Sequence, residues 1–213
     1  MESDPIEPFN RAMHEFNYTI DGVILRPVAS IYRGIMPETG REMVTNAIEN
    51  LYTPVVFFNS VLQLDPENSF VAFWRFVINS TVGIGGVFDV ASEAGLKMRP
   101  ADLGQTFAVY GAESGAYVVL PIIGPSNVRD SLGRLGDALM NPFNHIDEGL
   151  SYAIWSATAV DQRSNNMELI DDVYKNSLDP YATFRSGYTQ KRAADIKRAK
   201  TMRAKSQEKA LNP

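Results

Sequence analysis

The most informative pattern in the chain is the apolar stretch from Phe70 to Val90. On a helix that turns about 100° per residue, its large side chains gather on one side. These residues are Phe70, Phe73, Trp74, Val77 and Ile78. Neighbouring apolar residues widen the arc to roughly 220°, whereas a surface helix of a globular protein shows a stripe of about 100°. Only a strip with Arg75 and Asn79 is polar, so the pattern predicts a helix enclosed by a protein core or by lipid.

A second uncharged run extends from Asn50 to Leu64 and contains Pro54. Neither this run nor the uncharged residues 76–88 reach the ~20 residues that a transmembrane helix needs. Two apolar segments of this length suit helices that lie within one leaflet or at the interface of a membrane. They also suit helices buried in a protein core, which are more common. The hydrophobic pattern alone leaves both readings open.

Periodicity and turn signals divide the N-terminal half mainly into helices. One helix spans residues 5–20 and ends at Asp21-Gly22, and an apolar segment continues over 23–31. A further helix runs from about residue 41 to 51, with Thr39 as its cap, and Pro54 kinks or breaks it. Ser69 is the expected cap of the central helix. This helix ends at a bend that contains Gly83, Gly85 and Gly86.

The C-terminal half begins with a change of period. Strand-like runs at 105–110 and 117–120 predict a small β-hairpin, whose turn contains Gly111 and Gly115. A short helix follows, capped by Ser126 or Asn127 and extending to residue 139. The pattern is helical again over 147–176 and over 181–205. The expected fold is therefore mainly α, with one small hairpin and a C-terminal helix.

Charge is distributed unevenly along the chain. Residues 1–184 carry a net charge of −12 and residues 185–213 a net charge of +7. We therefore predict a single helical domain over 1–184 and a basic helical tail over 185–213. The tail is either solvated or binds anionic lipid headgroups or an acidic partner. Nucleic acid is not an expected partner, because the tail lacks interleaved aromatic residues and the acidic body repels phosphates.

The sequence contains no assembled catalytic or metal-binding motif. There is no cysteine, which excludes thiolate nucleophiles, disulfides and cysteine metal sites. His14 and His145 have no partner at metal-ligand spacing. Gly83–Gly86 does not fit the G-x-G-x-x-G register, and Ser114 does not lie in a G-x-S-x-G elbow. We therefore expect no enzyme activity, no metal and no cofactor.

The apolar helices carry a few polar residues whose placement has two explanations. Asn46 and Asn50 lie on the polar side of the helix predicted from about residue 41 to 51. Arg75 and Asn79 lie on the polar side of the central helix that begins at Phe70. If lipid or protein covers the apolar arcs, these polar strips face each other across a water-filled passage. Alternatively, the polar groups hydrogen-bond one another in a closed core.

Four blocks of the sequence resemble the VacJ family, which is also called MlaA. They are DPIEPFNRAMHEFN, RPVASIYR, FWRFVINSTVGIGGVFDVA and DLGQTFAVYGAESGAYVVLPIIGPSNVRD, with a weaker match in SLDPYATFRSGY. The blocks cover nearly all of residues 4–190 in the order typical of the family. The family's lipid-modified N-terminal cysteine is missing. MESDPIEPF shows no signal peptide, so the protein is either cytosolic or a chain whose targeting segment was removed.

The resemblance implies a lipoprotein in the inner leaflet of the outer membrane, on its periplasmic face. It implies a ring of amphipathic helices around a passage, associated with a trimeric porin. Such a protein removes mislocalised phospholipids from the outer leaflet and passes them to a periplasmic carrier protein, which maintains lipid asymmetry. A membrane-associated scaffold and a lipid-modifying enzyme of the cell envelope are the alternatives.

The transport reading assigns roles to the candidate residues. Asn46, Asn50, Arg75 and Asn79 are expected to form the polar strip of the passage. Phe57, Phe58, Phe73, Trp74 and Val77 are expected to contact lipid. The glycines at 83, 85, 86, 111 and 115 are expected to act as hinges that gate the passage.

Overall fold

The computed structural model describes residues 4–211 and is mainly helical, as the sequence predicts. The first half contains α1 (Glu7–Ile20), the π-turn η1 (Asp21–Leu25), α2 (Arg26–Ile35), α3 (Glu38–Leu62), α4 (Pro66–Thr81) and α5 (Val90–Glu93). The second half contains α6 (Leu103–Val109), β1 (Tyr117–Leu120), β2 (Gly124–Asn127), α7 (Val128–Met140), the 3₁₀ turn η2 (Pro142–His145), α8 (Glu148–Asn165), α9 (Met167–Asn176) and α10 (Pro180–Leu211).

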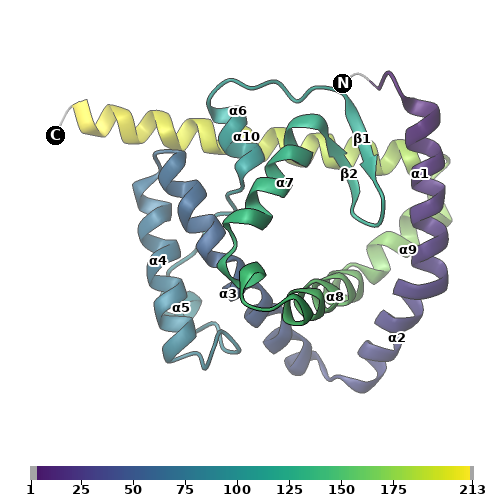
Figure 1. Cartoon of the computed structure of the whole chain (residues 1–213), viewed down its shortest axis with the longest axis horizontal. Coiled ribbons are helices and arrows are strands. Elements are labelled where there is room, and N and C mark those ends of the chain that lie inside the picture. Colours follow the sequence, from purple (N-terminus) through teal and green to yellow (C-terminus); the bar gives the residue numbers. More distant parts are fainter. Residues whose placement is uncertain (1–3, 212–213) are drawn as a thin grey trace.

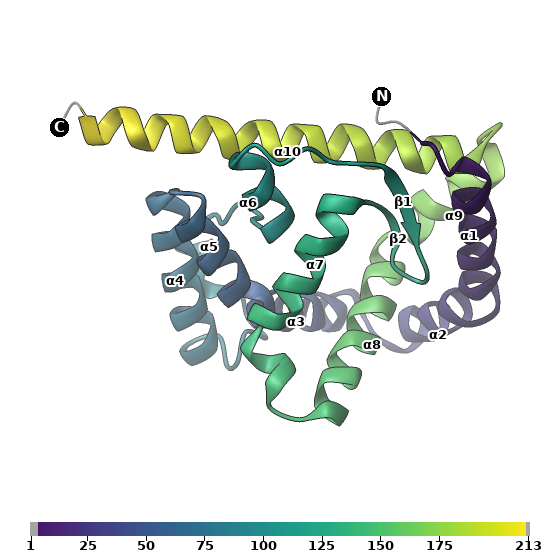
Figure 2. The same ribbon diagram turned by 45° about the horizontal axis from the view of Figure 1, so that its top comes forward.

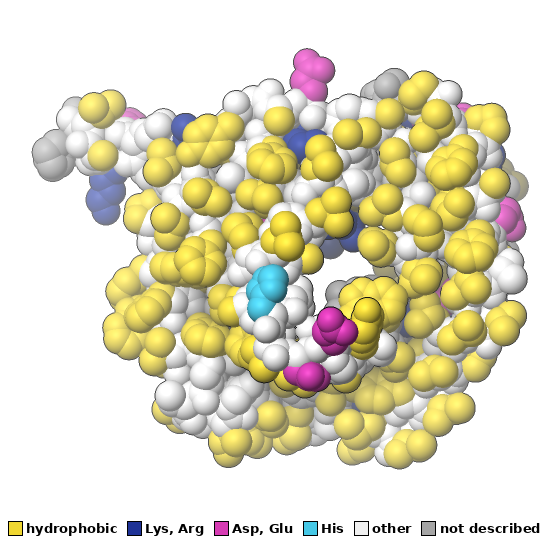
Figure 3. All heavy atoms as spheres, in the orientation of Figure 1, with side chains coloured by type: hydrophobic (Ala, Val, Ile, Leu, Met, Phe, Trp, Pro, Cys, Tyr) yellow, Lys and Arg dark blue, Asp and Glu magenta, His cyan; other side chains and the backbone are white. Residues whose placement is uncertain are grey.

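The elements form a ring whose centre is bordered by α7, α8 and the hairpin (Figure 1), and an opening remains there when all heavy atoms are drawn (Figure 3). Helix α10 runs along one side of this ring and crosses behind α6 and the hairpin (Figures 1 and 2). The accessible surface is 12310 Å². A compact monomer of this mass would expose about 9,800 Å². The excess is what an open ring with a protruding helix requires.

The interior of the ring is polar and its exterior is apolar. Among the described residues, 10 apolar residues are buried, against 22 polar or charged ones, while 34 large apolar side chains are exposed. The two apolar clusters are small: one contains Val56, Ala72 and Ala101, and the other Tyr117, Val119 and Tyr181. Water-soluble proteins show the reverse distribution, since burial of apolar surface is what drives their folding. Hydrogen bonds and ion pairs therefore carry much of the specificity of this fold.

The sequence signals partly misplaced the boundaries of helices α3 and α4. Helix α3 continues through Pro54 and begins at Glu38, so Thr39 is inside the helix and is not its cap. Helix α4 begins at Pro66, four residues before the predicted start, because the Asp65 side chain accepts the Asn68 N–H. Ser69 is therefore not a cap either; its hydroxyl donates to the Asp65 carbonyl.

The structure contains one small hairpin, as predicted, but not the predicted pairing of 105–110 with 117–120. Residues 103–109 form helix α6, because the Asp102 side chain caps it by accepting the Gln105 N–H. The hairpin pairs β1 with β2 in antiparallel register, from Tyr117 opposite Asn127 to Leu120 opposite Gly124. Gly111 and Gly115 therefore lie in the segment that joins α6 to β1, and not in the hairpin turn.

Three further boundaries differ from prediction. The first helix does not end at Asp21-Gly22, since η1 carries it continuously into α2. The helical stretch over 147–176 is divided at Asn166 into α8 and α9. Helix α10 extends to Leu211, six residues beyond the predicted end at 205. The domain boundary at residue 184 stays a prediction, and this residue lies within α10. Asn127 rather than Ser126 caps α7, by accepting the Asp130 N–H.

A buried group of charges attaches α10 to the ring. The Arg192 guanidinium contacts Asp102 at the start of α6 (Nη1–Oδ2 2.6 Å) and Asp130 in the first turn of α7 (Nε–Oδ2 2.7 Å). Arg129 also contacts Asp130, and the Tyr188 hydroxyl donates to the same carboxylate. Burial alone would raise the pKa of Asp130, but these donors hold it at about 2. One arginine of the basic tail thus joins three separate elements.

Replacing Arg192 with Met should lower the free energy of unfolding by about 3 kcal/mol, because the partly buried Asp102 would lose its cation and the buried Asp130 would keep only Arg129. Urea denaturation in detergent, followed by circular dichroism, measures this change. Arg198→Met is the matched control, since Arg198 pairs with Asp195 on the exposed side of α10. The control should change stability by less than about 0.5 kcal/mol. Equal effects of the two substitutions would contradict the role given to Arg192.

Candidate functional site

The predicted lipid-contacting residues form one aromatic patch on α3 and α4. Phe58, Phe73 and Trp74 are exposed, and Phe70 joins them at 60 % exposure. Neighbouring rings pack against each other, with centroids 5.4 Å apart for both Phe57–Phe58 and Phe73–Trp74. Phe57 is half-buried against the cluster around Val56, and Val77 is half-buried on α4. The sequence therefore identified a contiguous apolar surface, although two of its five members lie at the edge of the interior.

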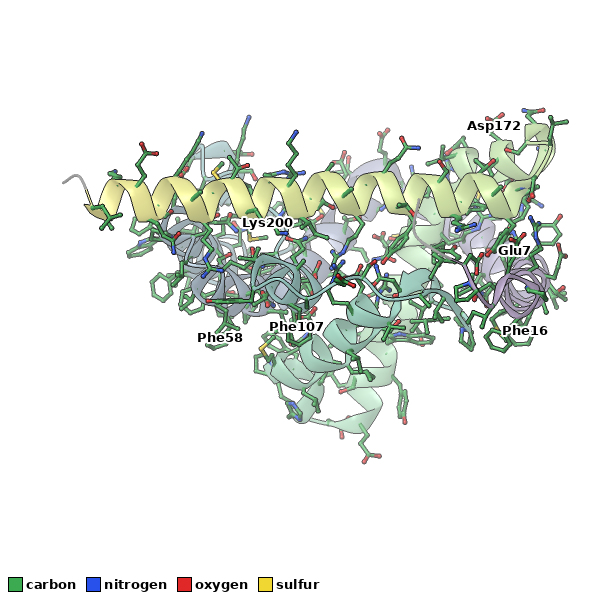
Figure 4. All side chains as sticks on the ribbon, turned by 90° about the horizontal axis from the view of Figure 1, so that it is seen from above. Glu7, Phe16, Phe58, Phe107, Asp172 and Lys200 are labelled. Atoms are coloured by element: carbon green, nitrogen blue, oxygen red, sulfur yellow. The ribbon has the colours of Figure 1, made fainter. Side chains whose placement is uncertain are left out.

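The apolar surface continues around the ring beyond the predicted residues. Exposed aliphatic and aromatic side chains occur on α1, η1, α2, α7 and α8. They include Phe9, Phe16, Val23, Ile24, Ile31, Ile35, Leu132, Leu135, Leu139, Tyr152 and Trp155. Hydrophobic side chains cover most of the visible face, around an opening near its centre (Figure 3). Phe16 and Phe58 lie on the side of the body away from α10 (Figure 4). Patches of this extent mark contact with a membrane or a partner.

Arg75 and Asn79 are buried and hold the segment after α4. Arg75 forms an ion pair with Asp89 (Nη2–Oδ2 2.9 Å) and donates to the Ser92 hydroxyl and the Leu96 carbonyl. Asn79 donates to Asp89 and accepts the Ala91 N–H. Burial alone would raise the pKa of Asp89, but the hydrogen bonds from Ser92, Asn79 and Arg75 lower it overall. The hydrogen bonds account for the burial of both residues.

Asn46 and Asn50 face the same segment from α3. The Asn46 Nδ2 lies 3.4 Å from the Val87 carbonyl, and the Asn50 Nδ2 lies 3.0 Å from the Ser80 hydroxyl. The structure thus brings the four predicted polar residues together, around residues 80–96. Each of them bonds to that segment, which leaves the choice between a closed core and a passage open. Their predicted role in lining a passage stays a prediction.

Gly83 and Gly86, in the first predicted hinge, pack closely against neighbouring residues. Gly86 has φ +92°, and a Cβ there would lie 2.4 Å from the Asn50 Cβ. Gly83 would place a Cβ 2.2 Å from the Phe88 carbonyl oxygen. Both positions therefore need glycine for packing, whatever their part in gating. Gly85, Gly111 and Gly115 also have positive φ. Hinge motion at these five positions stays a prediction.

A second set of polar residues, which the sequence analysis missed, lies where α3 meets α7. Asp137 is 5 % exposed, and its Oδ1 accepts from the Asn59 Nδ2 at 2.8 Å and from the Leu103 N–H at 3.1 Å. The Tyr52 hydroxyl lies 3.4 Å from its other oxygen. Tyr52 is 40 % exposed, yet the surrounding protein raises its pKa. A side chain that is accessible to solvent but closely surrounded is what we expect at the wall of an opening.

A similar polar contact joins α3 to α8. Asp161 is 3 % exposed and accepts from the Thr45 hydroxyl at 2.8 Å and from the Tyr32 hydroxyl at 3.3 Å. These residues were not predicted, because each pairing joins positions more than 100 residues apart. The sequence offers one local signal for these missed contacts, which is that Thr45 and Tyr52 lie on the less apolar side of α3.

Two other features were not found among the described residues. Between residues 4 and 211, no three His, Asp or Glu side chains are grouped closely enough to hold a metal ion. Within the same range, no helix has the combination of length and apolar character that is needed to cross a bilayer. The polar contacts and the apolar exterior make the opening the candidate site.

The chain is similar to known proteins in both sequence and structure. The family model described as MlaA lipoprotein matches residues 2–195. A protein of Escherichia coli K12 named "Intermembrane phospholipid transport system lipoprotein MlaA" is 35% identical over 193 residues, which cover 89% of this chain and 76% of that protein. An uncharacterized protein of Rickettsia bellii is 38% identical over 204 residues, which cover 94% of this chain and 79% of that protein. A solved structure described as "Structural basis for maintenance of bacterial outer membrane lipid asymmetry" matches with TM-score 0.82 and 34% identity, covering 91% of this chain and 99% of that chain.

The stability of the α3–α7 contact should depend on pH through Asp137. Burial, with a smaller contribution from Asp102, raises the pKa of Asp137 to about 6 from its ordinary 3.8. The folded protein therefore binds this proton more readily than the unfolded chain, so stability from this group is full below about pH 4 and is lost as the pH rises through 6. Asp137→Asn should remove this dependence. The difference in unfolding free energy between wild type and variant should change by on the order of 2 kcal/mol between pH 4 and 7.

Denaturation in detergent at several pH values, compared between wild type and Asp137→Asn, provides the measurement. A constant difference across this range would show that the carboxyl titrates normally. Asp147→Asn is a control on an exposed carboxylate, which caps α8 by accepting the Leu150 N–H. This variant reports any effect of pH that does not depend on Asp137.

Proposed function

Because the chain belongs to the MlaA lipoprotein family, we propose that it transports phospholipids between membranes without catalysing a reaction. The observation that carries this proposal is the inverted ring: polar residues are buried, and apolar residues cover the outside of a structure with a central opening. A phospholipid has the same division, with a charged headgroup and apolar acyl chains. The protein can therefore accommodate both parts at once.

The apolar exterior supports a position within one leaflet. Each large side chain left exposed to water forgoes on the order of 1–2 kcal/mol of transfer free energy, which acyl chains would supply. Helix α10 lies on the opposite side from Phe16 and Phe58 and carries the basic residues of the tail (Figure 4). We therefore place the apolar side in the inner leaflet of the outer membrane and α10 toward the periplasm. A lipid anchor at the N-terminus of the full-length protein would hold it there.

A polar passage lowers the main barrier to lipid movement. A charged headgroup that enters hydrocarbon loses its water, at a cost of many kcal/mol. The wall between α3, α7 and α8 offers polar groups instead, while acyl chains can follow the aromatic patch of Phe57, Phe58, Phe73, Trp74 and Val77. In this scheme Asn46, Asn50, Arg75 and Asn79 hold residues 80–96 beside the passage. The glycines at 83, 85, 86, 111 and 115 would let the segments that contain them move.

The direction and partners of transport form the more detailed part of the proposal. Mislocalised phospholipids would leave the outer leaflet, cross the ring and pass to a soluble periplasmic carrier, which preserves lipid asymmetry. A trimeric porin would hold the ring in place. Family likeness supports these assignments, and the apolar perimeter offers enough surface for both a porin and lipid.

Mass spectrometry of lipids that co-purify with the protein tests the proposed activity. We expect intact phospholipid in the purified protein, because the polar wall and the aromatic patch match its two parts. Lysophospholipid would instead support the lipid-modifying enzyme, and the absence of lipid would support the scaffold. Reconstitution with labelled phospholipid vesicles then measures transfer directly.

The aromatic patch should control membrane binding. Replacing Phe70, Phe73 and Trp74 together with Ser should weaken partition into phosphatidylethanolamine–phosphatidylglycerol vesicles by roughly tenfold per residue, since each side chain transfers about 1–2 kcal/mol of apolar surface. Vesicle flotation measures this partition. Leu178→Ser is the control, because Leu178 is fully exposed between α9 and α10 and away from the patch. If the triple variant binds vesicles like the wild type, the patch does not face lipid.

A further inference from the structure

The arginines of this protein are paired with acidic groups almost throughout. Ten of them form ion pairs with Asp or Glu: Arg11, Arg26, Arg33, Arg75, Arg99, Arg129, Arg163, Arg185, Arg192 and Arg198. Arg203 lies over the Tyr110 ring and donates to the Val109 carbonyl. Within residues 4–211, the guanidinium groups of Arg41 and Arg134 have no such partner. Arg41 lies near Glu168, whose pKa its charge lowers, so Arg134 is the arginine without an acceptor assigned to it.

Arg134 lies on the border between two faces of α7. Asp130, Gly133 and Asp137 are buried on one face, against the body. Leu132, Leu135 and Leu139 are 57–73 % exposed on another. At about 100° per residue, Arg134 lies between these faces and is itself exposed. The exposed surface of α7, a helix that borders the opening, is therefore amphipathic, with Arg134 about 100–160° around the helix axis from the three exposed leucines.

The Tyr52 hydroxyl lies on the same border. It is 3.4 Å from Asp137, which is one turn along α7 from Arg134. The positive charge of Arg134 is close enough to lower the pKa of Tyr52, although burial and Asp137 raise it overall. The Asp137 carboxylate is buried and already accepts from Asn59 and Leu103, so it does not neutralise Arg134 by contact. Basic side chains are visible inside the opening (Figure 3).

We propose that Arg134, assisted by the Tyr52 hydroxyl, binds the phosphate of a phospholipid headgroup in the passage. This inference rests on the proposed function, which brings such a headgroup to α7. A guanidinium offers paired N–H donors that match two phosphate oxygens, and a phenol offers a third donor. The leucines on the neighbouring face of α7 would then contact the acyl chains.

Isothermal titration with two short-chain lipids tests the inference. Dihexanoylphosphatidylglycerol carries the phosphate, and dihexanoylglycerol has the same chains without it. The wild type should bind the phospholipid at least tenfold more tightly, since a hydrogen bond to a charged group contributes that much. Arg134→Gln should lose this preference while binding dihexanoylglycerol as before, Arg134→Lys should keep part of it, and Tyr52→Phe should reduce it by a smaller factor.

Arg198→Gln is the control, because it removes the same charge from an exposed position on α10. An unchanged preference in Arg134→Gln would overturn the inference and leave the proposed function standing. Equal loss of both lipids in that variant would also overturn it, because the phosphate would then not be what Arg134 recognises. If the wild type bound neither lipid, the proposed function itself would fail.

Discussion

The ring depends on polar groups that are removed from water and paired with one another. Its two apolar clusters are too small to hold fourteen elements together. Side-chain amides instead bind backbone across long distances in sequence: Asn10, which is fully buried, donates to the Tyr117 carbonyl and accepts the Val119 N–H. Asn17, two turns along α1, makes the same pair of contacts with Leu120 and Ile122. These bonds are directional, so they fix one arrangement where apolar contacts alone would permit several.

This constraint also explains how the ring can have an apolar outside. Next to acyl chains, exposed leucine and phenylalanine gain nothing from packing against each other, since lipid is as apolar as the protein surface. Specificity must then come from interactions that lipid cannot replace. The Arg192 contacts with Asp102 and Asp130 are of this kind, and so are the contacts of Asp161 with Thr45 and Tyr32. The same polar interior is what makes a passage for a headgroup possible.

Sequence patterns predicted those parts of the fold that depend on neighbouring residues. The apolar arc of α4 and the cap at Asn127 are local, and the aromatic patch follows from periodicity alone. The hairpin strand predicted over 105–110 was wrong because a distant partner decides its state. Gln105 and Thr106 are buried in α6, where the Nε2 amide of Gln63, the residue that follows α3, donates to the Thr106 hydroxyl. Alternating polarity therefore resembled a strand, although tertiary contacts favour a helix.

Periodicity alone does not reveal which role a polar residue of the site has. Arg75 and Arg134 both interrupt apolar faces, and a helical wheel treats them alike. Arg75 has Asp89 fourteen residues away to neutralise it, so it fastens a segment of the protein. Arg134 has no carboxylate in contact, so its charge remains available to a ligand. The sequence could locate both residues on their helices, but only the position of the partner distinguishes an arginine that holds the fold from one that can hold a phosphate.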